Sequence, residues 1–254
     1  MKRYKLIISD FDGSLVGKDL RISQENLEAL KELRENGLDI TLATGRRLQS
    51  VKPFMDKLGI KLPVILYNGA GIYDPVNNIW LYRKFLDPNI FKDILEFLRS
   101  LNLKILLGVY WKDELWELEE FESVDNIMRN DLVKFFIEAQ REVLEELKEL
   151  LEIYYKEKAE IVFSGEAYLE ILPKGCSKGN AMLWLVNFLN ISPKEVIAIG
   201  DYDNDIDLLE KAGLGIALPD SSFKIKEIAD YIALSGPELI LEEILKKFIR
   251  SEKS

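Results

Sequence analysis

Two aspartates, Asp10 and Asp12, stand two residues apart directly after the short apolar run 6–8. Such a run is typical of a buried strand, which places both carboxylates at the strand's end. Two carboxylates this close repel each other, and a turn with only a structural purpose rarely needs both. Gly13 follows them and lets backbone amides approach an anion. The stretch therefore predicts a site at which carboxylates do chemistry.

Three more polar clusters follow predicted strands. They are Thr44-Gly45-Arg46, Asn68-Gly69-Ala70-Gly71 and Gly200-Asp201-Tyr202-Asp203-Asn204-Asp205. In open α/β sheets, ligands bind outside the carboxyl ends of the strands. If the four strands belong to one parallel sheet, all four clusters gather at one edge. Each cluster alone is compatible with a solvated loop, but four together, two of them rich in aspartate, favour a common site.

The predicted chemistry is the binding of a divalent cation and a phosphate group. The clusters supply four carboxylates, those of Asp10, Asp12, Asp201 and Asp205. If they lay close together, they would repel one another unless a positive charge lay between them. Mg²⁺ suits carboxylate, carbonyl and water oxygens, and it often binds one or two carboxylates together with a substrate phosphate. The hydroxyl of Thr44 and the ammonium of Lys178 suit the phosphate oxygens.

The two leading aspartates suit different tasks. With a metal and a phosphate in place, Asp10 is suited to act as a nucleophile that forms an aspartyl-phosphate. Asp12 is suited to protonate the leaving group and later to activate water. The chain contains no histidine, which excludes Ser-His-Asp and Cys-His catalysis and histidine metal sites. A carboxylate is then the natural proton carrier.

These residues must be positioned by secondary structure. Strands and helices alternate at both ends of the chain, and this pattern predicts a parallel sheet covered on both faces. The expected strands are 4–8, 38–43, 63–67, 196–199, 214–218 and 231–234, and the expected helices are 23–36, 47–58, 177–189, 204–211, 222–229 and 237–250. Together they form a Rossmann-like α/β core made of residues 1–83 and 173–254.

The middle of the chain, residues 84–172, has a different pattern and is expected to form an inserted α+β domain. Its helices are expected at 88–101 and 140–152, and its strands at 103–110, 115–118, 132–138, 160–164 and 168–172. Residues 164–167 carry a hairpin signal between the last two strands.

The composition restricts the classes of molecule that this protein is expected to bind. The 254 residues carry a net charge of −10, which argues against a nucleic-acid binder. No apolar run approaches the roughly 20 residues of a membrane span, and the N-terminus does not resemble a secretory signal. A single cysteine, Cys176, excludes an internal disulfide and a cysteine zinc site. We expect a cytoplasmic protein, and the shortage of glutamine suggests a thermophile, which a melting temperature tests.

The motifs resemble those of the haloacid dehalogenase-like phosphohydrolases. The resemblance is carried by Asp-Phe-Asp-Gly-Ser-Leu, Ala-Thr-Gly-Arg, the Lys178 segment and Gly-Asp-Tyr-Asp-Asn-Asp, in this order, with the insertion between the second and third motifs. Asn68-Gly69-Ala70 and the Asn204-Asp205 pair are similar to the Cof-type branch, which includes sugar-phosphate phosphatases. The four motifs are specific together and weak alone. One departure is Ser14, where the family usually has threonine.

The resemblance implies a role for each motif residue. Asp10 is expected to be the nucleophile and a Mg²⁺ ligand, and Asp12 the general acid/base that binds Mg²⁺ through its carbonyl. Asp201 completes the metal site, with Asp205 as a ligand or a supporting residue. Phosphate and substrate contacts are expected from Thr44, Gly45, Arg46, Asn68, Lys178 and Asn204. The inserted domain is expected to be a cap that excludes water and contacts the leaving group.

Several alternatives stay open. A phosphomutase of the phosphomannomutase type needs basic cap residues for a second phosphate, and the cap offers Arg129, Lys134 and Arg141 without an obvious cluster. A non-enzymatic phospho-acceptor module also uses an acidic pocket with Mg²⁺, but it needs neither a cap nor a second aspartate. The leading prediction is a Mg²⁺-dependent phosphatase of small phosphomonoesters. Its substrate and its oligomeric state are left open.

Overall fold

The computed structural model describes residues 4–118 and 130–250. The chain divides into two compact units, Met1–Leu81 with Ser177–Ser254, here called the core unit, and Tyr82–Cys176, here called the inserted unit. The divisions fall at residues 82 and 176, close to the expected limits of 84 and 172. Among the described residues, no helix is both long and apolar enough to cross a membrane.

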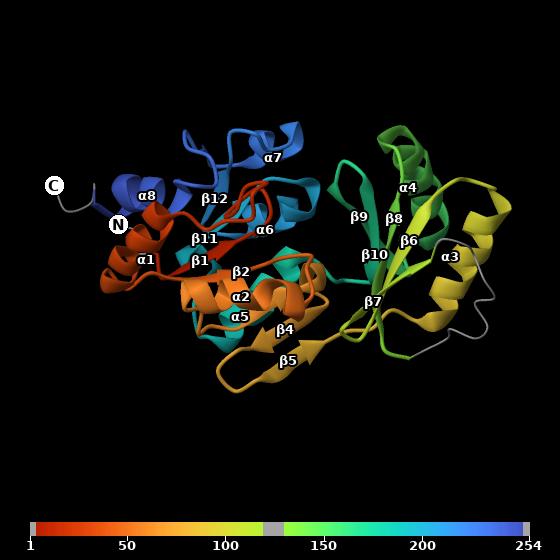
Figure 1. Ribbon diagram of the computed structural model, residues 1–254, viewed down its shortest axis with the longest axis horizontal. Coiled ribbons are helices and arrows are strands. Elements are labelled where there is room, and N and C mark those ends of the chain that lie inside the picture. Colours follow the sequence, from red (N-terminus) through yellow and green to blue (C-terminus); the bar gives the residue numbers. More distant parts are fainter. Residues whose placement is uncertain (1–3, 119–129, 251–254) are drawn as a thin grey trace. The chain divides into compact units, whose positions relative to one another are not determined.

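The core unit contains a parallel five-stranded sheet in the order β13-β12-β11-β1-β2 (Figure 1). The strands are β1 (Leu6–Ser9), β2 (Asp39–Leu42), β11 (Val196–Gly200), β12 (Leu214–Ala217) and β13 (Tyr231–Ile232). Every residue of β1, β11 and β12 is buried, so both faces of the central sheet are covered. The expected α/β fold is confirmed.

Helices follow the strands as the apolar spacing predicts. They are α1 (Gln24–Glu35), α2 (Leu48–Leu58), α5 (Lys178–Phe188), α6 (Ile206–Lys211), α7 (Phe223–Ile228) and α8 (Ile240–Ile244). Ser23 caps α1 through its side chain, and Gly59 ends α2 in the left-handed conformation. The helix expected over 237–250 is α-helical only in α8 and continues as a π-helix over Leu245–Arg250.

The third expected parallel strand is placed differently. β3 (Val64–Leu66) pairs with β4 (Gly71–Asp74), which neighbours β5 (Ile79–Arg83), in a separate three-stranded sheet. An isolated parallel bridge, Ala43 with Ile65, connects β3 to the end of β2. The chain reverses through Tyr67, Asn68 and Gly69, which all have positive φ angles. Because β4 returns antiparallel along β3, the parallel pattern ends there.

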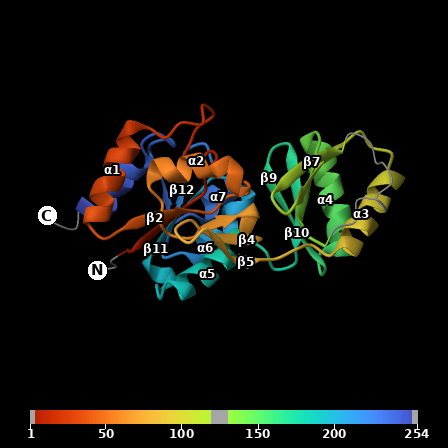
Figure 2. The same cartoon turned by 60° about the horizontal axis from the view of Figure 1, so that its bottom comes forward.

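The inserted unit is an antiparallel sheet in the order β7-β6-β8-β10-β9. Its strands are β6 (Leu106–Trp111), β7 (Glu114–Leu118), β8 (Leu132–Glu138), β9 (Ala159–Gly165) and β10 (Tyr168–Pro173). Figure 2 shows both helices, α3 (Pro88–Ser100) and α4 (Arg141–Tyr155), on one side of this sheet. The expected α+β organisation and the hairpin between β9 and β10 are present.

Candidate active site

Asp10 and Asp201 are neighbours because their strands are neighbours. Ser9 at the end of β1 lies beside Ile199 in the parallel register with β11, and the amide of Asp10 donates to the carbonyl of Ile199 at 2.8 Å. Each aspartate therefore leaves the carboxyl end of its strand at the same edge of the sheet. Asp10, Asp201 and Asp205 each offer a carboxylate oxygen, and these oxygens lie within 4.8 Å of one another.

Lys178 supplies a positive charge within this cluster. Its Nζ donates to Oδ1 of Asp10 and to Oδ1 of Asp205, both at 2.6 Å. The side chain is 1% exposed, so solvent screens these ion pairs little. Lys178 is the first residue of α5, and the Ser177 side chain caps the helix by accepting from the amide of Asn180. The lysine predicted from its position at the start of a helix thus reaches the predicted nucleophile.

Asp201 is oriented by the loop that carries the first motif. Oγ of Ser14 donates to Oδ1 of Asp201 at 2.9 Å. Gly13 has a φ of +79°, and a Cβ on it would lie 2.3 Å from Oδ2 of Asp201. Glycine is therefore required for the loop to approach this carboxylate. The serine that departs from the usual threonine retains the hydroxyl that makes this contact.

Asp205 uses both carboxylate oxygens within the protein. Oδ1 accepts from Lys178, while Oδ2 accepts from the amides of Asp201 at 3.2 Å and Tyr202 at 3.3 Å. The residue is fully buried. It therefore fixes the turn after β11 as well as the lysine.

The electrostatics of the cluster indicate an excess of negative charge. Burial raises the pKa of Asp10 well above its ordinary value, and the carboxylates of Asp205 and Asp201 add to this rise, although Lys178 opposes it. Burial, and next the charge of Asp205, raises the pKa of Asp201 to about 6. Burial alone would lower the pKa of Lys178, but Asp10 and Asp205 outweigh it and the pKa is raised. One ammonium does not neutralise three carboxylates, so this donor set fits a further divalent cation.

Asp12 points to a different partner. Nε of Arg46 donates to Oδ2 of Asp12 at 2.7 Å, and Nη2 donates to Oδ1 at 2.6 Å. The guanidinium also lies over the Phe11 ring, 4.9 Å from its centroid. The carboxylate of Asp12 therefore pairs with Arg46 and is not among the three carboxylates that could share a cation. Arg46, expected as a substrate contact, holds the predicted acid/base.

The remaining predicted residues form a second connected group. Thr44 is buried, and its Oγ1 accepts from the amide of Arg46 at 3.1 Å. The amide of Asn68 donates to the carbonyl of Thr44 at 3.0 Å, and Oδ1 of Asn68 accepts from Nδ2 of Asn204 at 3.1 Å. A Cβ on Gly45 would lie 3.1 Å from Nδ2 of Asn68. The second motif, the Asn-Gly turn and the fourth motif are thus joined by hydrogen bonds.

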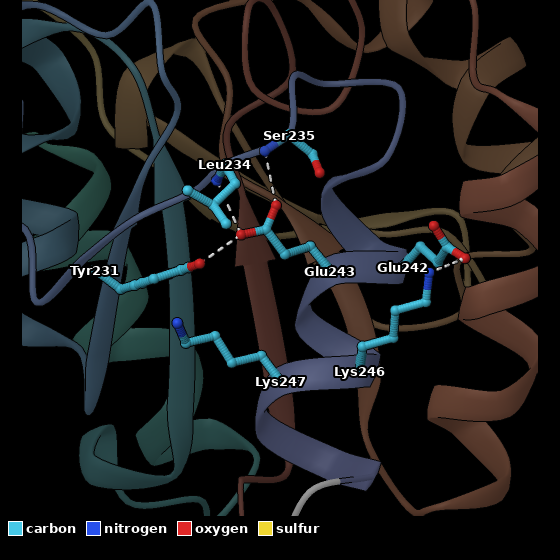
Figure 3. Close-up of a pocket in the computed structure, with 7 residues that line it drawn as sticks. All are labelled: Tyr231, Leu234, Ser235, Glu242, Glu243, Lys246 and Lys247. Atoms are coloured by element: carbon cyan, nitrogen blue, oxygen red, sulfur yellow. Dashed lines mark hydrogen bonds and ion pairs between the residues drawn. The ribbon is translucent and has the colours of Figure 1, made fainter.

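A pocket of about 330 Å³ in the core unit contains none of the predicted site residues. It is lined by Tyr231, Leu234, Ser235, Glu242, Glu243, Lys246 and Lys247. Figure 3 shows the carboxylate of Glu243 directed at the Tyr231 hydroxyl and at the backbone amides of Leu234 and Ser235. These hydrogen bonds connect α8 to the segment after β13, and they therefore stabilise the fold.

Two side chains that organise this site had no predicted role. Ser14 was noted only as a departure from the family pattern, and Asp207 was not considered, although it bonds the first turn of α5. The side-chain contacts of both residues join segments far apart in the chain. A hydroxyl next to a motif aspartate was the available signal for Ser14, and no local signal marked Asp207.

Comparison with known proteins agrees with the motifs. A family model described as haloacid dehalogenase-like hydrolase matches residues 7–238. Phosphatase YwpJ of Bacillus subtilis (strain 168) is 30% identical, over 96% of this chain and 100% of that protein. The 5-amino-6-(5-phospho-D-ribitylamino)uracil phosphatase YcsE of the same strain is 29% identical, over 90% of this chain and 89% of that protein.

The fold agrees as well. A solved haloacid dehalogenase-like hydrolase from B. subtilis superposes with a TM-score of 0.82 at 26% identity, covering 96% of this chain and 99% of that one. The motif resemblance, the α/β core and the matched length are therefore consistent with one another. The chain belongs to the haloacid dehalogenase-like hydrolases, in their Cof-type branch, and it is a phosphatase that hydrolyses phosphoric monoesters.

Proposed function

We propose that this phosphatase depends on Mg²⁺ and hydrolyses small phosphorylated metabolites through an aspartyl-phosphate on Asp10. The observation that carries the proposal is the contact of Lys178 with Asp10 at 2.6 Å, inside a cluster completed by Asp201 and Asp205. Asp10 lies at the end of a central strand, next to the buried ammonium of Lys178. It is therefore suited to attack a phosphorus atom whose oxygens this ammonium helps to hold.

The reaction proceeds in two steps. In the first, a carboxylate oxygen of Asp10 forms a bond to phosphorus, the bond from phosphorus to the leaving oxygen breaks, and Asp12 gives that oxygen a proton. In the second, Asp12 accepts a proton from a water molecule whose oxygen bonds to phosphorus, and the bond to Asp10 breaks. The products are an alcohol, inorganic phosphate and the original enzyme. Arg46 pairs with both oxygens of Asp12, so one of these two hydrogen bonds must open before that oxygen carries the proton that Asp12 donates.

The cation would be held by Asp10, the carbonyl of Asp12 and Asp201, with Asp205 supporting them. When bound, Mg²⁺ supplies positive charge that offsets the carboxylates and the phosphate oxygens. Thr44 with Gly45, Lys178 and Asn204 are the proposed phosphate contacts, and Asn68 holds Asn204. All of these residues lie in the core unit, and the inserted unit is proposed to act as the cap during turnover.

The substrate class is a phosphomonoester of a small polar metabolite. The relative YcsE is named for 5-amino-6-(5-phospho-D-ribitylamino)uracil, which carries a phosphate on a polyol chain. Sugar phosphates have the same type of ester and belong in the same substrate panel.

We further propose a cytoplasmic location and an origin in a thermophile. A melting temperature in the ordinary mesophile range would count against that origin.

A phosphomutase is the second candidate, and the inserted unit argues against it. Lys134 bonds Glu170 and is buried with it, while Arg141 bonds Glu145 and lies over the Phe163 ring. Basic residues engaged in this way offer little to a second phosphate. Arg129, the third basic residue considered, lies outside the described residues. Hydrolysis is therefore the favoured reaction.

The deciding experiment measures phosphate release from a panel of phosphomonoesters, including a generic aryl phosphate, with Mg²⁺ and with EDTA. Asp10→Asn removes the nucleophile, and Asp19→Asn is the control, because Asp19 is exposed and its Oδ1 accepts from the nearby amide of Arg21. We expect turnover that EDTA and Asp10→Asn abolish and that the control retains. Absence of turnover on every ester, or equal activity of Asp10→Asn and wild type, contradicts the proposal. Formation of an isomeric sugar phosphate would identify a mutase.

A further inference from the structure

We propose that Asp207 is a positioning residue that holds Lys178 against Asp10. It stands two residues after Asp205, in the first turn of α6, and no motif includes it. The inference rests on the proposed function in one respect, because it takes the contact of Lys178 with Asp10 as catalytically important. The contacts that support it are independent of that function.

The carboxylate of Asp207 bonds the residues on both sides of Lys178. Ser177 donates its hydroxyl to Oδ2 of Asp207 in a short hydrogen bond, and the amide of Gly179 donates to Oδ1 at 3.2 Å. The same Ser177 hydroxyl accepts from the amide of Asn180 at 3.1 Å. Two amides of the first turn of α5, which lack partners within the helix, are thereby satisfied.

Lys211 extends this connection across the two helices. Its Nζ donates to Oδ2 of Asp207 at 3.1 Å and to Oδ1 of Asn180 at 2.7 Å. The helices approach so closely that a Cβ on Gly179 would lie 2.4 Å from the carbonyl oxygen of Asp207. Side chains from α6 therefore fix the backbone from which Lys178 extends.

The geometry makes Lys178 sensitive to this backbone. Asp205 holds the ammonium of Lys178, and Asp207 bonds the Ser177 side chain before Lys178 and the Gly179 amide after it, so one short segment positions both ends of the lysine. A lysine side chain is flexible, and its Nζ must stay 2.6 Å from Asp10. A misplacement of about 1 Å by a residue outside the chemistry costs on the order of 100-fold in rate.

A simpler role for Asp207 is that of an acidic residue in the first turn of a helix, which contributes about 0.3–1 kcal/mol to stability. Asp39 provides a matched control for such general effects. It accepts from the amide of Ile40 at 2.8 Å and pairs with Nε of Arg34 at 2.7 Å, at the start of β2, the end away from Thr44. It thus has two kinds of partner that Asp207 also has, a backbone amide and a basic side chain.

The test compares three variants by steady-state kinetics with an aryl phosphate and Mg²⁺. Asp207→Ala is expected to lower kcat by about 10- to 100-fold with a smaller change in KM, because the proposed phosphate contacts Thr44, Gly45 and Asn204 remain. Asp207→Asn keeps an acceptor for Gly179 but puts an amide donor where Ser177 and Lys211 donate, so its kcat should fall between those of wild type and Asp207→Ala. Asp39→Ala should stay within about threefold of wild type.

Two kinetic outcomes overturn the proposal. One is a kcat of Asp207→Ala within about threefold of wild type, and the other is an equal loss in Asp39→Ala. Amide hydrogen exchange over residues 177–180 provides a readout that does not need activity. Asp207→Ala should speed this exchange, and Asp39→Ala should not; unchanged exchange in Asp207→Ala contradicts the connection. If wild type released no phosphate, the proposed function would fail, while exchange would still decide whether Asp207 holds this turn.

Discussion

Arg46 holds Asp12 through both carboxylate oxygens, with Nε to Oδ2 at 2.7 Å and Nη2 to Oδ1 at 2.6 Å. The side chain of Asp12 is 49% exposed and that of Arg46 is 26% exposed, so the pair contributes little to stability. Its consequence is orientation, because a two-point contact fixes the plane of the carboxylate.

We expect Arg46→Ala to lower kcat/KM by about 10-fold or more while the melting temperature changes little. Arg46→Lys should fall between wild type and alanine, since lysine keeps the charge but not the paired geometry. Arg47→Ala is the control, because Arg47 donates to Ser50 rather than to Asp12. Equal losses in Arg46→Ala and Arg47→Ala would show that the contact with Asp12 does not matter.

Replacement of Lys178 should make stability depend strongly on Mg²⁺. Lys178→Met leaves Asp10 and Asp205 without their ammonium in a buried site, so we expect the free energy of unfolding in EDTA to fall by about 3–5 kcal/mol. Mg²⁺ should recover part of the loss. Urea unfolding with Mg²⁺ and with EDTA measures both effects.

The control for this variant is Lys224→Met, which removes an exposed pair with Asp203 and should cost less than about 1 kcal/mol. A loss of the same size in both lysine variants, or no recovery of Lys178→Met by Mg²⁺, would contradict the description of the cluster as a cation site.

Gly69 should not tolerate a side chain. Its φ is +94°, and a Cβ would lie 2.2 Å from the carbonyl oxygen of Ser177, an atom of the backbone that cannot move aside cheaply. We expect Gly69→Ala to lower the free energy of unfolding by about 2 kcal/mol or more. Gly17→Ala, where the nearest atom is 3.8 Å away, should be nearly neutral. Similar urea midpoints for the two variants would refute the close approach.

Glu243 should contribute to stability only above acidic pH. Although burial raises its pKa, hydrogen bonds from the Tyr231 hydroxyl and the amides of Leu234 and Ser235 outweigh this and lower the pKa. A folded-state pKa below the unfolded value of about 4.3 gives stability that is present above that pH and lost as pH falls through the folded value. The difference in melting temperature between wild type and Glu243→Gln should therefore be largest near neutrality and shrink below about pH 4.

Glu242→Gln is the matched control, because Glu242 makes an i,i+4 pair with Lys246 on the surface. Its melting temperature should follow wild type closely at every pH. A pH-independent difference for Glu243→Gln would mean that its carboxylate has no special environment.

Much of the architecture could be predicted from local patterns. β8 has the predicted bounds, 132–138, and β1, β11 and α5 lie within one or two residues of expectation. Apolar periodicity and capping residues act within a few turns of chain, so they are visible in the sequence. β4 and β5 were not predicted, because their pairing with β3 depends on a reversal through three left-handed residues. The functional roles of the site residues stay predictions.

The sequence alone determined which side chains leave the carboxyl ends of the strands, since a chemical type and a strand boundary are both local properties. Only the tertiary structure decided how they pair: Lys178 with Asp10, Arg46 with Asp12, Asn68 with Asn204 and Asp207 with the turn around Lys178. These contacts join residues that are 28 to 168 positions apart in the chain. No local preference encodes such contacts, because they form only when packing of the sheet and helices brings distant turns together.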